Sequence, residues 1–188
     1  DFNGEKAIIS KHYKSLLALD KIPQKPVIFV PGIKGSLLEK NGEIVWLGLR
    51  QVFWNTQPLT YDDNDGIRPA GILTHLVAIP YFLEYRPYYL ITHELAQNPQ
   101  AYFFYYDWRG YPQKNADRFG QLVEKIIKET NQKPSVIAHS MGGLIVHGYL
   151  KEHPENIHKI VYLSVPFQPG IGYFDDVHGG VPTGLNKK

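Results

Sequence analysis

The strongest chemical signal in the sequence is a serine that lies between a predicted strand and a predicted helix. Ser140 follows an apolar strand predicted at 135–138 and precedes an apolar helix predicted at 141–152. This context is typical of a nucleophile elbow, a sharp turn that presents the serine hydroxyl at the end of a strand. The residues two before and two after the serine, Ala138 and Gly142, are small, as such a close approach of two chain segments requires. The pattern predicts that Ser140 accepts an acyl group.

Two backbone N–H groups are predicted to stabilise the oxyanion that forms when a serine attacks a carbonyl. The turn directs the N–H of Met141 toward that oxyanion, and the following helix N-terminus adds positive potential. The second donor is expected after the first core strand, Val27–Val30, where a Pro-Gly turn leads into Ile33. Ile33 is the candidate and Lys34 is the second choice. A chance serine in a glycine-containing turn, and a Pro-Gly turn with no chemical role, are the simpler alternatives.

Short apolar strands alternate with helical patterns along the chain, and this order positions the two motifs. Strands separated by helices of this length favour an α/β fold, with a parallel sheet, right-handed crossovers and helices on both faces. Ligands bind such sheets beyond the carboxyl ends of the strands, where the motifs lie. The predicted strands are 27–30, 101–106, 135–138 and 159–165; the predicted helices are 5–20, a helix within 75–97 interrupted near Pro80 and Pro87, an amphipathic helix through Phe119, Leu122, Val123, Ile126 and Ile127, and 141–152.

No repeat, low-complexity tract or linker divides the chain, so residues 1–188 are predicted to form a single domain. Segment 37–73 has no clear periodicity and is expected to be an irregular insertion, and the Gly- and Pro-rich tail 166–188 is expected to lead into a further cap and C-terminal region. An acidic run inside the insertion is predicted to be a turn. It is not expected to be a calcium loop, because the first and twelfth ligand positions would be Tyr61 and Ile72.

Composition excludes several classes of function. The formal net charge is +2 and no long basic run occurs, so electrostatics do not predict nucleic-acid binding or an anionic membrane partner. The absence of cysteine excludes disulfides, thiolate catalysis and cysteine-based metal sites, and it fits either a reducing or an oxidising compartment. No apolar run approaches the roughly 20 residues that a transmembrane helix needs, so a soluble protein is expected. No metal or cofactor is predicted.

Five motifs spread over most of the chain resemble the lecithin:cholesterol acyltransferase family of α/β-hydrolases. They are Val27 to Leu37, Trp46 to Leu49, Tyr106-Asp107-Trp108-Arg109, Lys133-Pro134 and Ser164 to Phe167. The resemblance implies a lipid ester or other carboxylic ester as substrate, peripheral contact with lipid surfaces, Ser140 as acyl carrier and no cofactor. Ala138 stands where the family more usually has glycine, a sterically mild departure. Because disulfide-bearing eukaryotic relatives need cysteines, the resemblance leans toward a microbial protein, extracytoplasmic or secreted.

The acid and the histidine of a catalytic triad follow the serine in α/β-hydrolases, each after a later strand. Only one further strand, 159–165, is predicted after Ser140. The acid and base are therefore expected outside this chain, in a longer protein of which this is the nucleophile half, and the isolated chain is expected to lack normal hydrolase activity. His139, which turn geometry points away from the serine, and His147, seven residues along the helix, do not fit as base.

Other residues near the predicted site leave alternatives open. The tail offers a local acid and base, which are Asp175 or Asp176 with His178. His153 and His158 are expected to be solvated surface groups. Asp107 and Arg109, at a strand end, either shape the acyl site or form a structural ion pair. The aromatic segments Tyr81–Tyr89 and Tyr102–Trp108 either line an acyl groove or belong to the core and surface.

The sequence therefore predicts a serine esterase, lipase or O-acyltransferase that works through an acyl-Ser140 intermediate. Hydrolysis and acyl transfer differ only in whether water or an alcohol attacks that intermediate. The alternatives are a non-catalytic binding module that keeps the hydrolase fold, and a peptidase or other hydrolase of the same fold.

Overall fold

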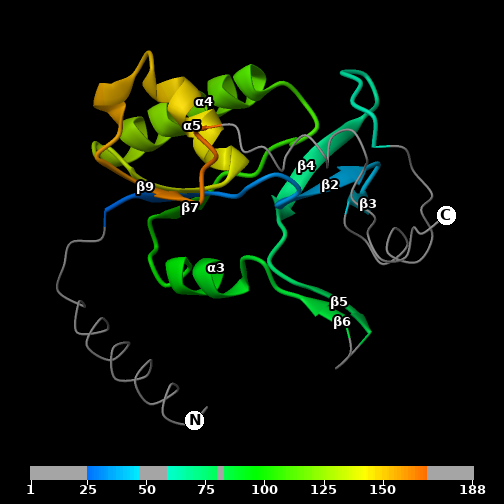
Figure 1. Cartoon of the computed structure of the whole chain (residues 1–188). Helices are drawn as coiled ribbons and strands as arrows, with labels where there is room; N and C mark the ends of the chain where they lie inside the picture. The colour runs from blue at the N-terminus through cyan, green and yellow to red at the C-terminus, as the bar shows by residue number, and fades with distance from the viewer. Residues whose placement is uncertain (1–24, 47–58, 80–82, 169–188) are drawn as a thin grey trace, which may run out of the picture.

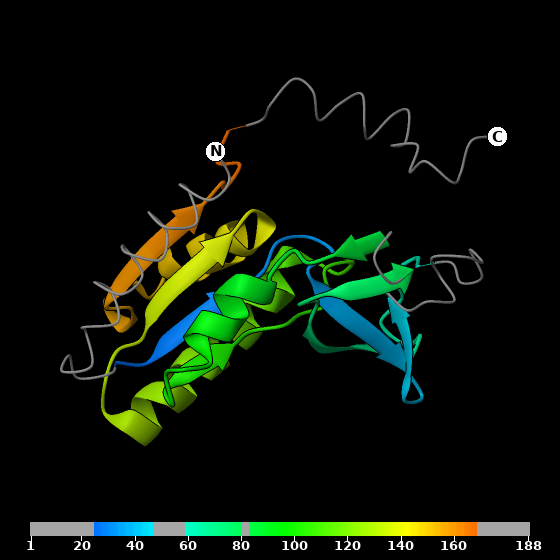
Figure 2. The ribbon, with the colours of Figure 1, turned by 90° about the horizontal axis from the view of Figure 1, so that it is seen from below.

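A four-stranded parallel sheet forms the centre of the protein. The computed structural model describes residues 25–46, 59–79 and 83–168. The strand order in the central sheet is β7-β1-β8-β9 and every pairing is parallel, which confirms the predicted α/β class. Figure 2 shows these strands side by side. Their bounds are β1 Val27–Val30, β7 Ala101–Phe103, β8 Ser135–His139 and β9 Lys159–Leu163.

Helices lie on both faces of this sheet (Figure 1). Two of them, α4 (Pro112–Thr130) and α5 (Met141–Leu150), pack on one face, and α3 (Tyr89–Leu95) lies on the other. Alternate residues of β1 face the two layers, since side chains alternate along a strand. Ile28 and Val30 join the core under α4 and α5, whereas the Phe29 ring contacts Tyr88, the residue before α3.

The amphipathic helix predicted around Phe119 is confirmed as α4. It begins at Pro112, which suits a first helical position because proline lacks the N–H that would be unpaired there. It ends at Thr130, and the next residue, Asn131, caps it with a left-handed backbone and an N–H that donates to the Ile127 carbonyl. Its inner face is buried against α5 and the sheet; the buried residues are Asn115, Ala116, Phe119, Gly120, Val123 and Ile126.

The prediction that segment 37–73 is irregular was wrong for the residues described. Residues 36–46 and 67–72 form a three-stranded antiparallel sheet of order β3-β2-β4, and residues 47–58 lie outside the description. Asn41 and Gly42 both have positive φ and join β2 to β3, as a tight hairpin turn requires. The strands are short and half exposed, so their apolar alternation is weak. Their bounds are β2 Ser36–Lys40, β3 Glu43–Trp46 and β4 Ile67–Ile72.

The interrupted helix predicted within 75–97 was also wrong for its first half. Strands β5 (Leu76–Ile79) and β6 (Leu83–Tyr85) pair antiparallel there, and the helix begins only after Pro87. Proline disfavours helical backbone in the residue before it and cannot donate within a helix, which explains the late start.

Two strand predictions need smaller corrections. The strand predicted at 101–106 ends at Phe103 and is only half buried, because β7 is an edge strand of the described sheet. The strand predicted at 159–165 is β9, which ends at Leu163 and forms the other edge, with Val161 51% exposed. A short 3-10 helix, Pro154–Asn156, precedes it. The predictions for 5–20 and for most of the tail fall on residues that are not described.

A buried arginine joins the small sheet to the central one. The Arg109 side chain is 2% exposed, and its Nη2 and Nη1 atoms lie 2.7 Å from Asp107 Oδ2 and 2.8 Å from Asp65 Oδ2, respectively. Its guanidinium also stacks over the Tyr61 ring. Asp107 follows β7 and Asp65 precedes β4, so the ion pairs hold the two sheets together. The structural interpretation of Asp107 and Arg109 is therefore the one that the contacts favour.

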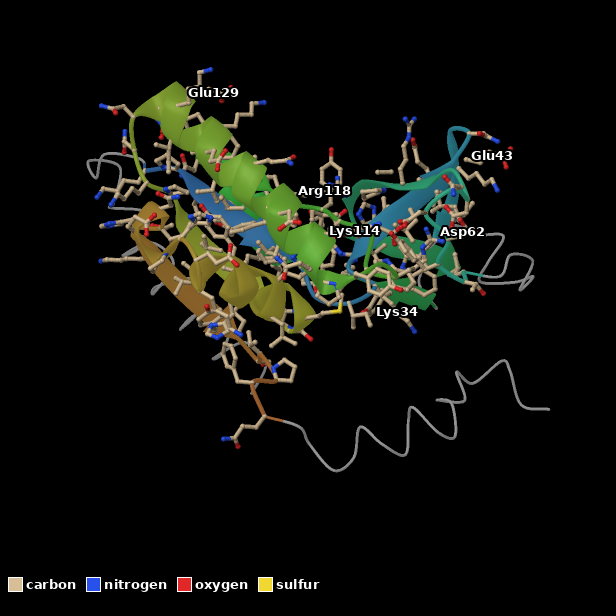
Figure 3. All side chains as sticks on the ribbon, turned by 90° about the horizontal axis from the view of Figure 1, so that it is seen from above. Lys34, Glu43, Asp62, Lys114, Arg118 and Glu129 are labelled. Carbon is tan, nitrogen blue, oxygen red and sulfur yellow. The ribbon has the colours of Figure 1, made fainter. Side chains whose placement is uncertain are left out.

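The loop around Asp62 is a turn, as predicted. The Asp65 N–H donates to the Asp62 carbonyl, and no group of potential metal-binding side chains occurs in the described ranges. Figure 3 shows this loop facing the start of α4, where Lys114 forms an exposed ion pair with Asp63. No described helix is both long and apolar enough to cross a membrane.

Arg109→Met should destabilise the protein strongly, because it leaves Asp107 and Asp65 without their cation in a largely buried position. We expect a loss of about 3–5 kcal/mol in the free energy of unfolding, measured by urea titration. Arg68→Met is the matched control, since Arg68 pairs with Glu39 on the surface and is 73% exposed. Its loss should stay within about 1 kcal/mol. Equal losses in the two variants would show that Arg109 does not join the sheets.

Candidate functional site: a strained serine beside a clamped loop

Ser140 adopts a backbone conformation that few non-glycine residues tolerate. Its φ is 50° and its ψ is −127°, between the end of β8 and the start of α5. The Ser140 N–H donates to the Leu163 carbonyl of β9 at 2.9 Å, and its own carbonyl accepts from the Gly143 N–H at 2.9 Å. Backbone strain of this kind persists only where the surroundings impose it, and it is concentrated at functional sites.

The elbow touches the loop that follows β1, and two glycines make this contact feasible. A Cβ on Gly142 would overlap the Pro31 carbonyl oxygen and lie 2.8 Å from Val30 Cγ1. A Cβ on Gly32 would lie 2.9 Å from the Cβ of Ser140. The small residue predicted to be necessary at position 142 therefore makes room for the loop after β1.

The loop after β1 is held by hydrogen bonds from two tyrosines. The Tyr106 hydroxyl donates to the Pro31 carbonyl at 2.9 Å, and the Gly32 N–H donates to the Tyr88 hydroxyl at 2.8 Å. The Gly35 N–H donates to the Gly32 carbonyl at 3.0 Å. Burial raises the pKa of the Tyr106 phenol, so this group keeps the proton that it donates. The path of the loop is thus fixed on both sides of Gly32.

The two predicted oxyanion donors stand on either side of this contact. Met141 directly follows Ser140, and Ile33 follows Gly32 in the clamped loop. Neither backbone N–H donates to any described residue, which leaves both able to bind an incoming oxygen. Lys34, the second choice, has a positive φ of 61°, and its carbonyl accepts from the Trp46 indole. The catalytic role of these groups stays a prediction.

A cavity of about 460 Å³ opens at Ser140, within the size range of small-molecule sites. Its walls are mainly apolar and aromatic, with Arg86, His139 and Ser140 itself as the polar exceptions. Tyr85 and Leu90 are exposed at 55% and 74%. The lining residues are Phe29, Gly32, Ile33, Tyr85, Arg86, Pro87, Tyr88, Leu90, Ile91, His139, Ser140 and Leu163.

The two aromatic segments considered for an acyl groove behave differently. Tyr85 and Tyr88, from segment 81–89, line the cavity at Ser140. Phe104 and Tyr106, from segment 102–108, are buried in the core between the sheet and α4. Only the first segment contributes to the cavity.

The motif at 106–109 supports the loop after β1. Besides the bond from Tyr106 to Pro31, the Trp108 indole N–H donates to the Ser36 carbonyl at 3.2 Å. The Ser36 hydroxyl in turn accepts from the Tyr106 N–H at 3.1 Å. Together with the ion pairs of Arg109, these bonds give the whole motif a structural role beside the elbow.

The described residues do not supply a base for Ser140. No described residue forms a hydrogen bond with the Ser140 hydroxyl. The His139 ring forms a hydrogen bond with the Tyr88 hydroxyl at 2.8 Å, and the His147 ring contacts the Phe167 ring. Neither histidine forms a hydrogen bond with the serine. Two further histidines, which follow α5 and precede β9, are exposed, as predicted; these are His153 and His158. The candidate acid and base of the tail, Asp175 or Asp176 with His178, lie outside the described residues.

Tyr88 is the residue of this site that sequence reasoning missed. It is 9% exposed, and its hydroxyl reaches both Gly32 and His139. No local pattern marks it, because its neighbours are aromatic and polar residues of a turn, and its role depends on how three distant segments meet.

A sequence model of the lecithin:cholesterol acyltransferase family matches residues 90–184, about half of the chain. The chain is 25% identical to the Arabidopsis thaliana protein Lecithin-cholesterol acyltransferase-like 4, over 79% of this chain and 35% of the relative. It is also 25% identical to Phospholipase A(1) LCAT3 of Arabidopsis thaliana, over 80% of this chain and 43% of the relative. An uncharacterized protein of Saccharomyces cerevisiae is 28% identical over 76% of this chain and 23% of its own length. The chain thus spans less than half the length of these relatives.

Gly142→Val should destabilise the protein more than Ser140→Ala does. A branched side chain at 142 would be driven into the Pro31 carbonyl and the Val30 side chain, whereas alanine removes only a hydroxyl. We expect Gly142→Val to lower the free energy of unfolding by at least about 1–3 kcal/mol. Thermal melts of the two variants measure the difference, and equal midpoints would show that the elbow and the loop do not touch.

Proposed function

The chain belongs to the lecithin:cholesterol acyltransferase family, and from this membership we propose that it carries the nucleophile of a serine hydrolase or acyltransferase acting on carboxylic esters. The observation that carries the proposal is the strained backbone of Ser140 beside a loop with an unengaged N–H, at the wall of a mainly apolar cavity. The simplest chemistry for this combination is attack of the serine hydroxyl on an ester carbonyl.

In the proposed reaction, Ser140 Oγ attacks the carbonyl carbon while its proton passes to a general base. The carbonyl oxygen becomes an oxyanion and accepts hydrogen bonds from the N–H groups of Ile33 and Met141. Collapse of this intermediate expels the alcohol, which takes a proton from the base, and leaves an acyl-Ser140 ester. Water or a second alcohol then attacks the acyl group. Each oxyanion donor is worth about 10²–10³ in rate, so the clamped loop matters for turnover.

The proposed substrates are lipid esters or other esters with an apolar acyl part. Apolar side chains line most of the cavity, and Leu90 and Tyr85 leave its rim apolar and exposed. Such a rim suits peripheral contact with a lipid surface. Two relatives carry names that include an acyltransferase and a phospholipase A(1), which fits this class of substrate. Ester cleavage by serine needs a base and an oxyanion site, so no cofactor is proposed.

We further propose that residues 1–188 form one domain of an α/β-hydrolase core, and that the triad acid and histidine come from residues outside the described ranges. This is consistent with the absence of any described group bonded to the Ser140 hydroxyl. The described cavity has one wall at β9, at an edge of the sheet, where further chain could present both groups beside Ser140.

Ser140→Ala, made in the complete protein that carries this chain, should abolish ester turnover without affecting folding. The hydroxyl is the proposed acyl acceptor, and loss of such a nucleophile costs roughly 10³–10⁶ in kcat. Hydrolysis of short-chain nitrophenyl esters measures the loss. Ser135→Ala is the matched control, because Ser135 lies at the opposite end of the same strand. Retained activity in Ser140→Ala would remove the serine from the mechanism and favour a binding module.

A further inference from the structure

One phenol joins the loop after β1 to the nucleophile elbow. The Tyr88 hydroxyl oxygen lies 2.8 Å from the Gly32 nitrogen and 2.8 Å from His139 Nδ1. Gly32 precedes a proposed oxyanion donor, and His139 precedes Ser140. Gly32 lies in the loop after β1, His139 is the last residue of β8, and the tyrosine comes from the turn before α3. Three parts of the fold therefore meet at a single oxygen atom.

The directions of these two hydrogen bonds follow from the groups involved. A backbone N–H can only donate, so the Tyr88 oxygen accepts from Gly32. The hydroxyl has no other acceptor among the described residues, so its single proton is paired only when it is donated to His139 Nδ1. In this arrangement Nδ1 accepts, and the ring N–H of His139 lies on Nε2. Burial raises the pKa of the Tyr88 phenol, so the hydroxyl stays protonated near neutral pH.

The Tyr88 ring has little room to move. It meets the Phe29 ring edge-on at 5.2 Å and the His139 ring at 5.7 Å between centroids. A Cβ on Gly35 would lie 2.8 Å from Tyr88 Cε2, so the ring packs directly on the loop backbone. The position of the hydroxyl is therefore set by the packing of its ring, independently of the two hydrogen bonds.

The peptide groups of the loop are fixed at three points. The Pro31–Gly32 peptide has its carbonyl held by Tyr106 and its N–H held by Tyr88. The next peptide has its carbonyl, that of Gly32, held by the Gly35 N–H. A trans peptide is planar, with its N–H opposite to its carbonyl, so fixing the Gly32 carbonyl also fixes the direction of the Ile33 N–H.

We propose that Tyr88 is a positioning residue that locks the oxyanion loop to the elbow, so that Ile33 rather than Gly32 presents its N–H to the reacting oxygen. This inference rests on the proposed role of Ser140. Tyr88 does not itself contact the reacting atoms in this mechanism. It acts by engaging the Gly32 N–H and by setting the distance between that loop and His139, next to the nucleophile.

Tyr88→Phe tests this role, because it keeps the ring and its aromatic contacts but removes both hydrogen bonds. In the complete protein, we expect kcat for nitrophenyl esters to fall about tenfold, less than the 10²–10³ that follows loss of a whole oxyanion donor. KM should change by less than about twofold, since the loop acts on the transition state. Tyr89→Phe is the matched control: its hydroxyl bonds to no described residue, and both kinetic constants should remain at the wild-type values.

A second measurement is independent of turnover. The ¹⁵N resonances of His139, assigned with a His139→Gln variant, report which ring nitrogen carries the proton. In wild-type protein at neutral pH we expect the Nε2–H tautomer, and in Tyr88→Phe a mixture of the two tautomers. This measurement does not depend on activity. If the ester assay shows no Ser140-dependent turnover, the proposed function is rejected, and the His139 resonances alone decide whether Tyr88 links the two segments.

The outcomes separate cleanly. A fall in kcat at constant KM together with a tautomer change supports the clamp. Unchanged kcat in a turnover-competent protein, or a rise in KM alone, overturns it. A wild-type His139 whose Nδ1 resonance is that of a nitrogen without a hydrogen bond also overturns it, and that result requires no variant of Tyr88 to fold.

Discussion

The site depends on the contact between the loop after β1 and the elbow after β8. These strands are neighbours in the sheet, with Val30 opposite Ala138, so the chain leaves both at the same edge. The backbone of Gly142 then meets the Pro31 carbonyl so closely that no side chain fits at that position. A serine between them must turn sharply, which gives its positive φ, and Ser140 and Ile33 both line the cavity that opens there.

Polar groups brought into such a contact must find partners, because a buried unpaired N–H or carbonyl costs about 1–3 kcal/mol. The aromatic residues around the loop meet this requirement. Tyr106 and Trp108 bind carbonyls of the loop, and Tyr88 binds an N–H. The buried Arg109 side chain forms two ion pairs, and these hold the small sheet against the same edge. The motif at 106–109, which resembles the family, thus has a structural role: it supports the loop that carries the proposed oxyanion site.

The sequence predicted those parts of the fold that rest on local periodicity. The parallel strands, α4 and the elbow carry strong patterns, and the structure has them within a few residues. The small antiparallel sheet was missed because its strands are half exposed, although Asn41-Gly42 is a hairpin signal that could have found it. The helix predicted within 75–97 was wrong before Pro87, because the two prolines at which it was expected to be interrupted exclude it from that half altogether. Tyr88 could not be predicted, since its partners come from two other strands. The roles of Ser140, Ile33 and Met141 stay predictions.

The central claim is that Ser140 is the nucleophile, and covalent labelling tests it most directly. The complete protein is treated with a fluorophosphonate ester, digested, and the modified residue located by mass spectrometry. We expect a single adduct, on the hydroxyl of Ser140, which denaturation before treatment prevents. An adduct on another residue, or an unmodified Ser140 in folded protein that still hydrolyses esters, would contradict the claim.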